Sequence, residues 1–434
     1  MKKILGAFLI VGMLVFIGSS LFAGGKQAQS SAKELVMFME ENNIRDDIQP
    51  ILFKDFETSS GYKINVINGG VDALYRQNLA VTLNSGQPID VLHCNGQAVR
   101  TFANRGIIDD ITKLVSYWDR FIPNSVEMFT YGGKVYGVPY SHINSSGLYS
   151  NNDVLRKYNL SLPRSYDDLV RMRDVLARDN VTVFAFGGGS KYMWPMWYFC
   201  AFAQTSGNKS MERTEATLRG QAKFTDKDYV DAMAVLERMG RDRFFQPGFN
   251  GTESDPAKSV FLTGNAALFF GGTWELQPFR ESGLTGDKMS MVGFPIVATG
   301  AKSEQTGAAC ASALCLRKGL NAEQQKAALQ FIDYLSSDAR VQQYFDLIGT
   351  SLPKPNKGYK VPANADPIVV NTIIPTLAPT TVTFLDWVWP AEVVAAFQDQ
   401  IQAVTGGQTT SAAAMAEIQK VFDNLVKNGY KFDN

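Results

Sequence analysis

Short apolar runs alternate with predicted helices over the first hundred residues of the chain. The runs are short enough for buried parallel strands, and one intervening stretch spaces its apolar side chains four residues apart, as on one face of a helix. The predicted strands are residues 34–39, 62–67 and 90–92. The predicted helices are residues 46–59, closed by Gly61, and a stretch that carries Tyr75, Leu79 and Leu83 and stops at Gly86. This order predicts a doubly wound α/β unit.

The same two kinds of pattern continue beyond residue 160. Ser165 and Asp168 have the residue types and the spacing of a capping box, and Asn321 is a further candidate cap, so each marks a helix start. Further strands are predicted at residues 181–186, 266–270, 291–297 and 311–316. Further helices are predicted at residues 254–264, in two stretches between Asn321 and Gly349, and at 391–404 and 410–426.

Residues 132–169 are interpreted as a passage from one lobe to another. A short strand at 134–140 is followed by the polar tract 141–146 and by a new short strand at 147–150. A chain of 434 residues is too long for one ordinary core and fits two lobes of roughly 150 to 200 residues each. Two further polar stretches that contain Gly or Pro are candidate crossings, at residues 299–307 and 351–355.

Composition excludes some partners. Hydrophobic content of 45% with charged content of 19% is typical of a folded protein. The 42 basic and 42 acidic residues balance, so the chain has no net field that would attract nucleic acid or anionic lipid. We therefore expect no nucleic-acid partner.

The N-terminus predicts export. Lys2 and Lys3 precede an apolar run at 4–17 and a small-residue zone that ends near Ala23, which is the order of a signal peptide. The run is short for a spanning helix, which needs about 20 residues, although an uncleaved anchor is the alternative. No Cys follows the run, so we expect no lipid anchor there. We expect a signal peptide at 1–23, a flexible leader at 24–32 and a periplasmic or extracellular protein.

The cysteines and histidines indicate no metal or cofactor. Cys94, Cys200, Cys310 and Cys315 each lie in an apolar stretch, which favours buried free thiols over the alternative of disulfides. The chain has no CxxC spacing and only two histidines, so we expect no zinc site. The glycines at 187–189 lack the spacing of a phosphate-binding loop.

Seven segments, in a fixed order, carry a resemblance. They are YKINVI, LNSGQPIDVLH, GGKVYGVPY, LYSNNDVLRKYNLSLPRSYDDL, FLTGNAALFFGGTW, ALQFIDYLSSDARVQQYF with a later GTSLP, and VTGGQTTSAAAMAEIQKVF. In this order the chain resembles the family 1 extracellular solute-binding proteins, the sugar-type receptors of ABC importers, of which maltose-binding protein is the best-known relative. The resemblance spans nearly the whole chain after residue 33.

The resemblance implies a type II-like periplasmic-binding-protein fold, in which two α/β lobes with doubly wound sheets are joined by hinge crossings. The implied lobes are 33–139 with 303–350, and 140–302 with 351–434. The implied hinges are 138–144, 295–307 and 349–353. A sugar would bind in the cleft between the lobes, hinge closure would follow, and a membrane permease would recognise the closed monomer. The resemblance implies neither a cofactor nor an enzyme.

A sugar has apolar faces and a rim of hydroxyl groups, so its site needs aromatic platforms together with groups that donate and accept hydrogen bonds. The residues that match the family pattern or this chemistry are Glu41, Asn42, Asn43, Asn95, Gln97, Tyr140, Asn144, Tyr192, Trp194, Trp197, Trp274, Glu275, Trp387 and Trp389. Trp274 is the strongest candidate for a ligand-binding residue, because residues 272–274 match the Gly-x-Trp of the family. Core packing is the alternative for each Trp. Maltose itself is disfavoured, because Asn42, Gln97 and Asn144 replace charged residues of maltose-type receptors.

Two other functions remain open at this point. An exported carbohydrate-active enzyme would need two carboxylates roughly 5 to 9.5 Å apart, and Glu41 and Glu275 are the candidates. A binding protein that feeds a sensor kinase would have the same fold as a transport receptor. A phosphodiester ligand is disfavoured, because Lys191 is the one basic residue that clearly lies in the predicted loops.

Overall fold

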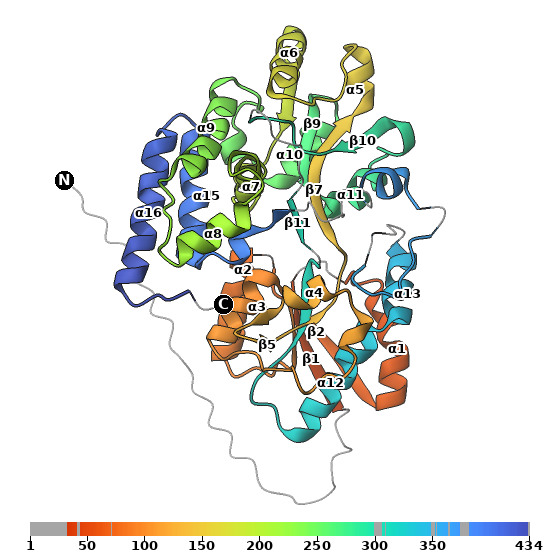
Figure 1. The fold of residues 1–434 in the computed structure, drawn as a ribbon. Helices are drawn as coiled ribbons and strands as arrows, with labels where there is room; N and C mark the ends of the chain where they lie inside the picture. Colours follow the sequence, from red (N-terminus) through yellow and green to blue (C-terminus); the bar gives the residue numbers. More distant parts are fainter. Residues whose placement is uncertain are drawn as a thin grey trace, which may run out of the picture.

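The computed structural model describes residues 33–40, 44–70, 72–298, 306–308, 310–348, 352, 354–362, 365–373 and 382–432. The predicted signal peptide and leader lie outside these ranges, as do the predicted site residues Glu41, Asn42 and Asn43. The described chain forms two lobes, each built on its own sheet (Figure 1).

Lobe I is built on a five-stranded sheet in the order β2-β1-β3-β12-β6. Its strands are β1 (Lys33–Met39), β2 (Tyr62–Asn68), β3 (Val91–Asn95), β12 (Ser312–Leu316) and β6 (Val138–Pro139). The first three are parallel, and β12 and β6 join antiparallel to their neighbours. The three strands predicted in the first hundred residues are thereby confirmed.

Helices cover both faces of this sheet, because successive side chains of a strand point to opposite faces. In β1, Met37 packs with α1 and α12, whereas its neighbour Phe38 packs with α2 and α3. The lobe I helices are α1 (Gln49–Ser60), α2 (Asp72–Asn84), α3 (Gly96–Asn104), α4 (Pro123–Glu127), α12 (Ala322–Ser336) and α13 (Asp338–Ile348). A small hairpin, β4 (Thr130–Tyr131) and β5 (Lys134–Val135), completes the lobe.

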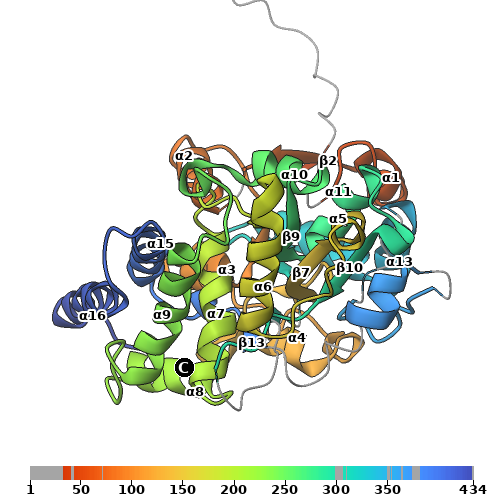
Figure 2. The ribbon, with the colours of Figure 1, turned by 90° about the horizontal axis from the view of Figure 1, so that it is seen from above.

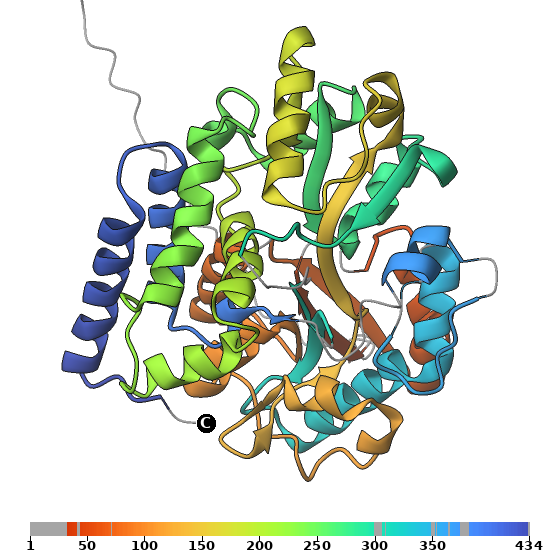
Figure 3. The ribbon, with the colours of Figure 1, turned by 45° about the horizontal axis from the view of Figure 1, so that its top comes forward.

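Lobe II is built on a six-stranded sheet in the order β13-β11-β7-β9-β8, with β10 paired to the far half of β7. Its strands are β7 (Asn144–Asn151), β8 (Thr182–Ala185), β9 (Ala266–Gly272), β10 (Met289–Val292), β11 (Thr306–Ala308) and β13 (Val382–Thr383). All eight residues of β7 are buried. This strand runs from the junction into the lobe (Figures 1 and 3).

The lobe II helices include the two C-terminal helices, which lie beside α9 at the outer edge (Figure 2). They are α5 (Asn152–Lys157), α6 (Tyr166–Leu176), α7 (Met193–Thr205), α8 (Ser210–Leu218), α9 (Lys227–Arg241), α10 (Ser254–Leu262), α11 (Leu276–Glu281), α15 (Ala391–Thr405) and α16 (Ser411–Lys427). The predicted capping box is confirmed, since Ser165 and Asp168 each accept a hydrogen bond from the other's backbone at the start of α6. Asn321 caps α12 as predicted.

Short helical turns lie between these elements. They are η1 (Trp118–Arg120), η2 (Ala177–Asp179), η3 (Phe249–Gly251), η4 (Thr273–Glu275), η5 (Gly286–Lys288), the π-turn η6 (Val369–Ile373) and η7 (Leu385–Trp387).

Two neighbouring segments connect the lobes. The Tyr140 N–H donates to the Ser312 carbonyl, and the Ala311 N–H donates to the His142 carbonyl, each over 2.9 Å. The connecting segments are therefore bonded to each other as they pass between the sheets. Ser141, inside the first, has φ of 107°, in the left-handed region that strains a residue with a side chain.

The structure corrects three expectations about these crossings. Residues 144–146 of the expected polar tract belong to β7. Strand pairing is made by backbone groups, so polar side chains do not prevent these residues from continuing the strand. Strand β11 pairs with β7 in lobe II, although its residues were expected in lobe I. Residues 354–359 pack on lobe I, where the Ile122 N–H donates to the Pro355 carbonyl, so the third crossing comes later than expected.

None of the helices in the described ranges is both long enough and apolar enough to cross a membrane. The four cysteines are buried and carry free thiols.

Candidate functional site

The candidate site lies where the two sheets face each other. The carboxyl ends of β1 and β3 and the amino end of β12 share one edge of the lobe I sheet, and both connecting segments leave from this edge. Open α/β sheets bind ligands at the carboxyl ends of their strands. We call this edge, together with the facing ends of β7 and β9, the lobe boundary.

Asn95 and Gln97 lie on the lobe I side of the boundary. Asn95 ends β3 and caps α3, because its Oδ1 accepts a hydrogen bond from the Ala98 N–H over 2.9 Å. Gln97, in the first turn of α3, accepts a hydrogen bond from Arg76 Nη1 and donates from Nε2 to the Asp386 carbonyl of lobe II, each over 3.3 Å. Gln97 therefore joins the two lobes in this structure.

Trp387 lies on the opposite side and contacts the start of α3. A Cβ atom placed on Gly96 would come within 2.3 Å of the Trp387 ring, so the indole rests directly on the glycine backbone. Trp387 also packs on Phe384 of lobe II, with ring centroids 5.3 Å apart. A half-buried aromatic ring thus covers the lobe I helix terminus from the side of lobe II.

Asn144 is the centre of a small polar network at the amino end of β7. Its Oδ1 accepts a hydrogen bond from Thr273 Oγ1 over 2.9 Å and lies 3.1 Å from His142 Nε2. Burial and, to a smaller extent, the nearby Lys354 ammonium lower the pKa of His142 to about 3. His142 is therefore neutral near pH 7. The network links the first connecting segment to the turn that follows β9.

Trp274 follows Thr273 and is half-buried. Its Nε1–H donates to Glu275 Oε1 over 3.1 Å, and its ring lies against Gly272. The other carboxylate oxygen of Glu275 lies 3.0 Å from Lys258 Nζ. Burial raises the pKa of Glu275, and Lys258 opposes this rise. Glu275 is fully buried, and its hydrogen bond holds the Trp274 ring in position from the core side.

Tyr140 and His93 lie at the lobe I end of the first connecting segment. Their rings meet edge to face with centroids 5.9 Å apart, and His93 Nε2 lies 2.7 Å from Ser312 Oγ. Burial lowers the pKa of His93 to about 3 and raises the pKa of Tyr140 well above its usual value. The Tyr140 hydroxyl and His93 Nδ1 are buried without a hydrogen-bond partner.

Lys354 is the residue at this boundary that the sequence analysis missed as a candidate. It is 5% exposed, and its Nζ has no hydrogen-bond partner. Burial lowers the pKa of its ammonium well below the usual value. The one sequence signal for Lys354 was its position between two prolines in a predicted crossing. Such a pattern predicts neither the burial of the side chain nor the lack of a hydrogen-bond partner.

Trp194 and Trp197 do not lie at the boundary. Both were predicted as candidate platforms for a sugar, with core packing as the alternative, and the structure places both inside α7, where twelve of thirteen residues are buried. Trp194 donates from Nε1 to the Gly188 carbonyl over 3.1 Å, and Trp197 packs edge to face on Phe184. A helix that is apolar on every side is buried on every side, so these rings form the core of lobe II.

Trp389 also differs from a surface platform. Trp389 is 3% exposed, and its ring stacks on Phe397 with centroids 4.1 Å apart. Tyr192 is half-buried at the start of α7. Lys191 beside it pairs with Asp399 over 2.6 Å at the surface. Among the predicted residues that the structure describes, those that meet at the boundary are Asn95, Gln97, Tyr140, Asn144, Trp274, Glu275 and Trp387.

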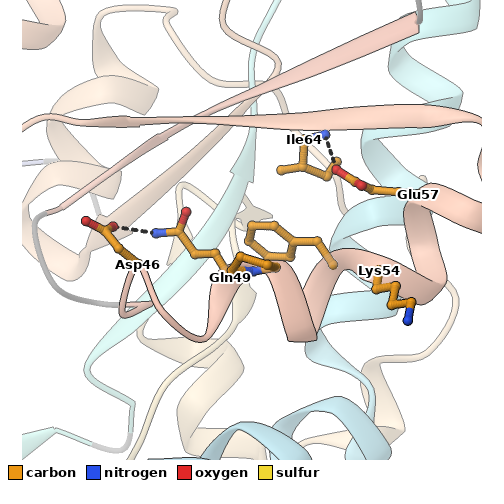
Figure 4. A pocket seen from close by; sticks show the side chains of 7 residues that line it. Asp46, Gln49, Lys54, Glu57 and Ile64 are labelled. Atoms are coloured by element: carbon orange, nitrogen blue, oxygen red, sulfur yellow. Dashed lines mark hydrogen bonds between the residues drawn. The ribbon is translucent and has the colours of Figure 1, made fainter.

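A hollow of about 280 Å³ lies elsewhere, between α1 and the edge strand β2 (Figure 4). Three of its polar side chains already have partners: Gln49 donates to Asp46 over 3.0 Å, and Glu57 accepts from the Ile64 N–H over 3.0 Å. We therefore do not assign a ligand to it. No group of three or more His, Cys, Asp or Glu in the described part of the chain could hold a metal ion.

Several known proteins with similar sequences are named as sugar-binding proteins. The multiple sugar-binding protein of Streptococcus mutans is 23% identical over 434 residues, which cover 96% of this chain and 98% of that protein. The galactooligosaccharide-binding protein of Bacillus subtilis is 22% identical over 291 residues, with 62% and 63% of the two chains covered.

Solved structures show the same fold. A chitin oligosaccharide binding protein superposes with a TM-score of 0.78 at 21% identity, over 91% of this chain and 98% of that chain. The solute-binding protein RafE in complex with raffinose superposes with a TM-score of 0.72 at 19% identity, over 90% and 99%. Residues 52–376 match the family model described as bacterial extracellular solute-binding protein. The chain therefore belongs to the bacterial extracellular solute-binding protein family.

Proposed function

We propose that this protein binds a sugar or oligosaccharide between its two lobes and delivers it to the membrane permease of an ABC importer. The observation that carries the proposal is that aromatic and amide side chains from both lobes meet at one boundary. Trp387 of lobe II lies on Gly96 of lobe I, and Gln97 of lobe I donates to the Asp386 carbonyl of lobe II.

The chemistry of the boundary suits a sugar. Trp274 and Trp387 are half-buried rings that can stack on the apolar face of a pyranose. Gln97 and Asn144 carry amide groups that can both donate to and accept from hydroxyl groups. The names of the relatives support the same ligand class, since the proteins named above bind multiple sugars, galactooligosaccharides, chitin oligosaccharides and raffinose.

We propose binding without catalysis. Glu275, one of the two carboxylates considered for a glycosidase, is buried behind Trp274 and paired with Lys258. A general acid must reach the glycosidic oxygen of its substrate, which this position does not favour. Membership of a family described as extracellular supports export, and we propose that residues 1–23 act as the export signal.

A thermal-shift screen of the purified chain tests the ligand class. A ligand that binds only the folded state stabilises it by about 2.7 kcal/mol at a hundred times its dissociation constant. Mono- and oligosaccharides should include at least one that raises the melting temperature and is recovered unchanged. Recovery of a cleaved product would instead support the enzyme, and a panel without any shift would remove the sugar proposal.

Small-angle scattering tests the proposed closure. If the ligand holds the lobes together, its addition should lower the radius of gyration, because a ligand that contacts both lobes stabilises the closed state. Scattering curves that superpose with and without a ligand of proven affinity would contradict hinge closure. Unlike the thermal shift, this measurement responds to shape and not to stability.

A further inference from the structure

Lys354 places a cationic side chain at the lobe boundary in an environment that offers it no partner. The residue is 5% exposed, and its Nζ has neither a hydrogen bond nor an ion pair with any described residue. An unpaired ammonium group is among the most costly groups to bury. Among the described residues, no side chain supplies an anion that would balance this charge.

The groups around Lys354 are neutral. Its ammonium lies against the ring of Phe345 and close enough to His142 and Cys310 for electrostatic interaction with both. Tyr344, the neighbour of Phe345 on α13, is also buried. At neutral pH these side chains are uncharged: burial lowers the pKa of His142, so its ring is neutral, and raises the pKa of Cys310 and Tyr344, so both keep their protons.

A second buried donor without a partner among the described residues lies on the first connecting segment, two residues before His142. The Tyr140 hydroxyl is buried without a hydrogen-bond partner, and the Tyr140 backbone is bonded to Ser312 beside Cys310. Tyr140 precedes His142 by two residues, and His142 bonds to Asn144 of lobe II. The Lys354 side chain and the Tyr140 backbone thus both lie near Cys310, at the point where the chain enters the second lobe.

We propose that the ligand of this protein carries a carboxylate, as a uronic acid or a uronate-containing oligosaccharide does, and that Lys354 pairs with this group while Tyr140 donates to it. The inference rests on the proposed sugar-binding function and narrows its ligand class. One ammonium and one hydroxyl match a single negative charge, whereas a phosphate dianion is usually bound by several cationic or backbone donors.

Isothermal titration with matched sugar pairs provides the test. The pairs are galacturonate with galactose, glucuronate with glucose, and digalacturonate with galactobiose, and glucose 6-phosphate serves as the phosphate control. Wild-type protein should bind at least one uronate about tenfold or more tightly than its neutral partner, as expected for a hydrogen bond to a charged group. Preference for the phosphate would overturn the carboxylate assignment.

Lys354→Met removes the charge and keeps most of the apolar stem. This variant should lose the preference for the uronate, with the affinity for the neutral partner changed by less than about twofold. Lys191→Met is the matched control, because Lys191 pairs with Asp399 at the surface and should not affect the preference. A Lys354→Met protein that keeps the preference would overturn the role of Lys354.

The wild-type titration decides the inference even if the variant does not fold. Neutral sugars that bind as well as their uronate partners would overturn the inference and leave sugar binding in place. Absence of binding by every neutral and acidic sugar would instead remove the proposed function itself.

Discussion

The indole of Trp387 lies against the backbone of Gly96, so that a Cβ atom at residue 96 would fall 2.3 Å from its ring. The two residues belong to different lobes and are almost three hundred positions apart in the sequence. The contact is next to the hydrogen bond from Gln97 to the Asp386 carbonyl. It shows that this arrangement of the lobes requires a residue without a side chain at the start of α3.

Gly96→Ala should therefore weaken ligand binding without weakening the fold. Gly96 has an ordinary backbone for a first helical residue, and Ala is the better helix former, so the free protein should melt within a few degrees of wild type. The added methyl group must displace the Trp387 ring, and we expect about a tenfold loss of affinity, which corresponds to about 1.4 kcal/mol. Titration calorimetry measures the affinity.

Gly251→Ala is the matched control, since a Cβ atom there meets nothing within 4 Å. It should bind as wild type does. Equal affinities for Gly96→Ala and wild type would show that the ligand is bound with the lobes in a different arrangement.

Trp274 and Trp197 should respond in opposite ways to truncation. Trp274→Ala should lower ligand affinity about tenfold or more, because it removes an aromatic platform, and should affect unfolding little. Trp197→Ala should cost about 3 to 5 kcal/mol of unfolding free energy, because it leaves a cavity in the core of lobe II. Urea denaturation and titration calorimetry on both variants separate the two roles. A Trp274→Ala protein with unchanged affinity would remove Trp274 from the site.

Lys258→Met should destabilise the protein in a pH-dependent way. The substitution leaves the buried carboxylate of Glu275 without its cation. We expect the free energy of unfolding near pH 7 to fall by up to about 3 kcal/mol, which is the lower end of the usual cost of breaking a buried ion pair, because Lys258 is partly exposed. Burial already raises the pKa of Glu275 above its value in the unfolded chain, so the folded state binds that proton more tightly. Stability therefore falls as the pH rises through the raised pKa.

The difference in unfolding free energy between Lys258→Met and wild type should accordingly be smaller at pH 4.5 than at pH 7. Adding Glu275→Gln to Lys258→Met should recover part of the loss at pH 7, because the neutral amide costs less to bury. A loss that is the same at both pH values would mean that the carboxylate is not the group responsible.

The two histidines should make the fold sensitive to acid. His93 and His142, the only two in the chain, both have pKa values lowered to about 3 by burial. Between pH 6.5 and pH 3 the unfolded chain takes up protons that the folded chain does not, so this contribution to stability is present above pH 6.5 and is lost as the pH falls. Each histidine contributes a slope of up to about 1.4 kcal/mol per pH unit.

Urea unfolding of wild type, His93→Gln, His142→Gln and the double variant at pH 6.5, 5.5 and 4.5 measures this slope. Each substitution should remove part of the dependence on pH, and the double variant should lose most of it over this range. If the double variant keeps the slope of wild type, the carboxylates and not the histidines account for the acid sensitivity.

Local signals predicted the elements well and the site only in part. The capping box at Ser165 and the cap at Asn321 are formed by residues a few positions apart, so their spacing was sufficient. Trp194 and Trp197 were predicted as candidate platforms for a sugar, but both belong to the core of lobe II. The burial of α7 on all sides depends on the sheet and on the helices that surround it in the folded lobe.

The sequence alone determined the strands and helices with clear apolar spacing or caps, the α/β class and the resemblance to solute-binding proteins, because these depend on the spacing of residues that are close along the chain. The tertiary structure decided which of the candidate aromatic rings meet at the lobe boundary, that β11 joins lobe II, and that Lys354 is buried without a partner. Such features depend on contacts between segments that are distant in the sequence, where the environment of a side chain is set by the packing of both lobes and not by its neighbours in the chain.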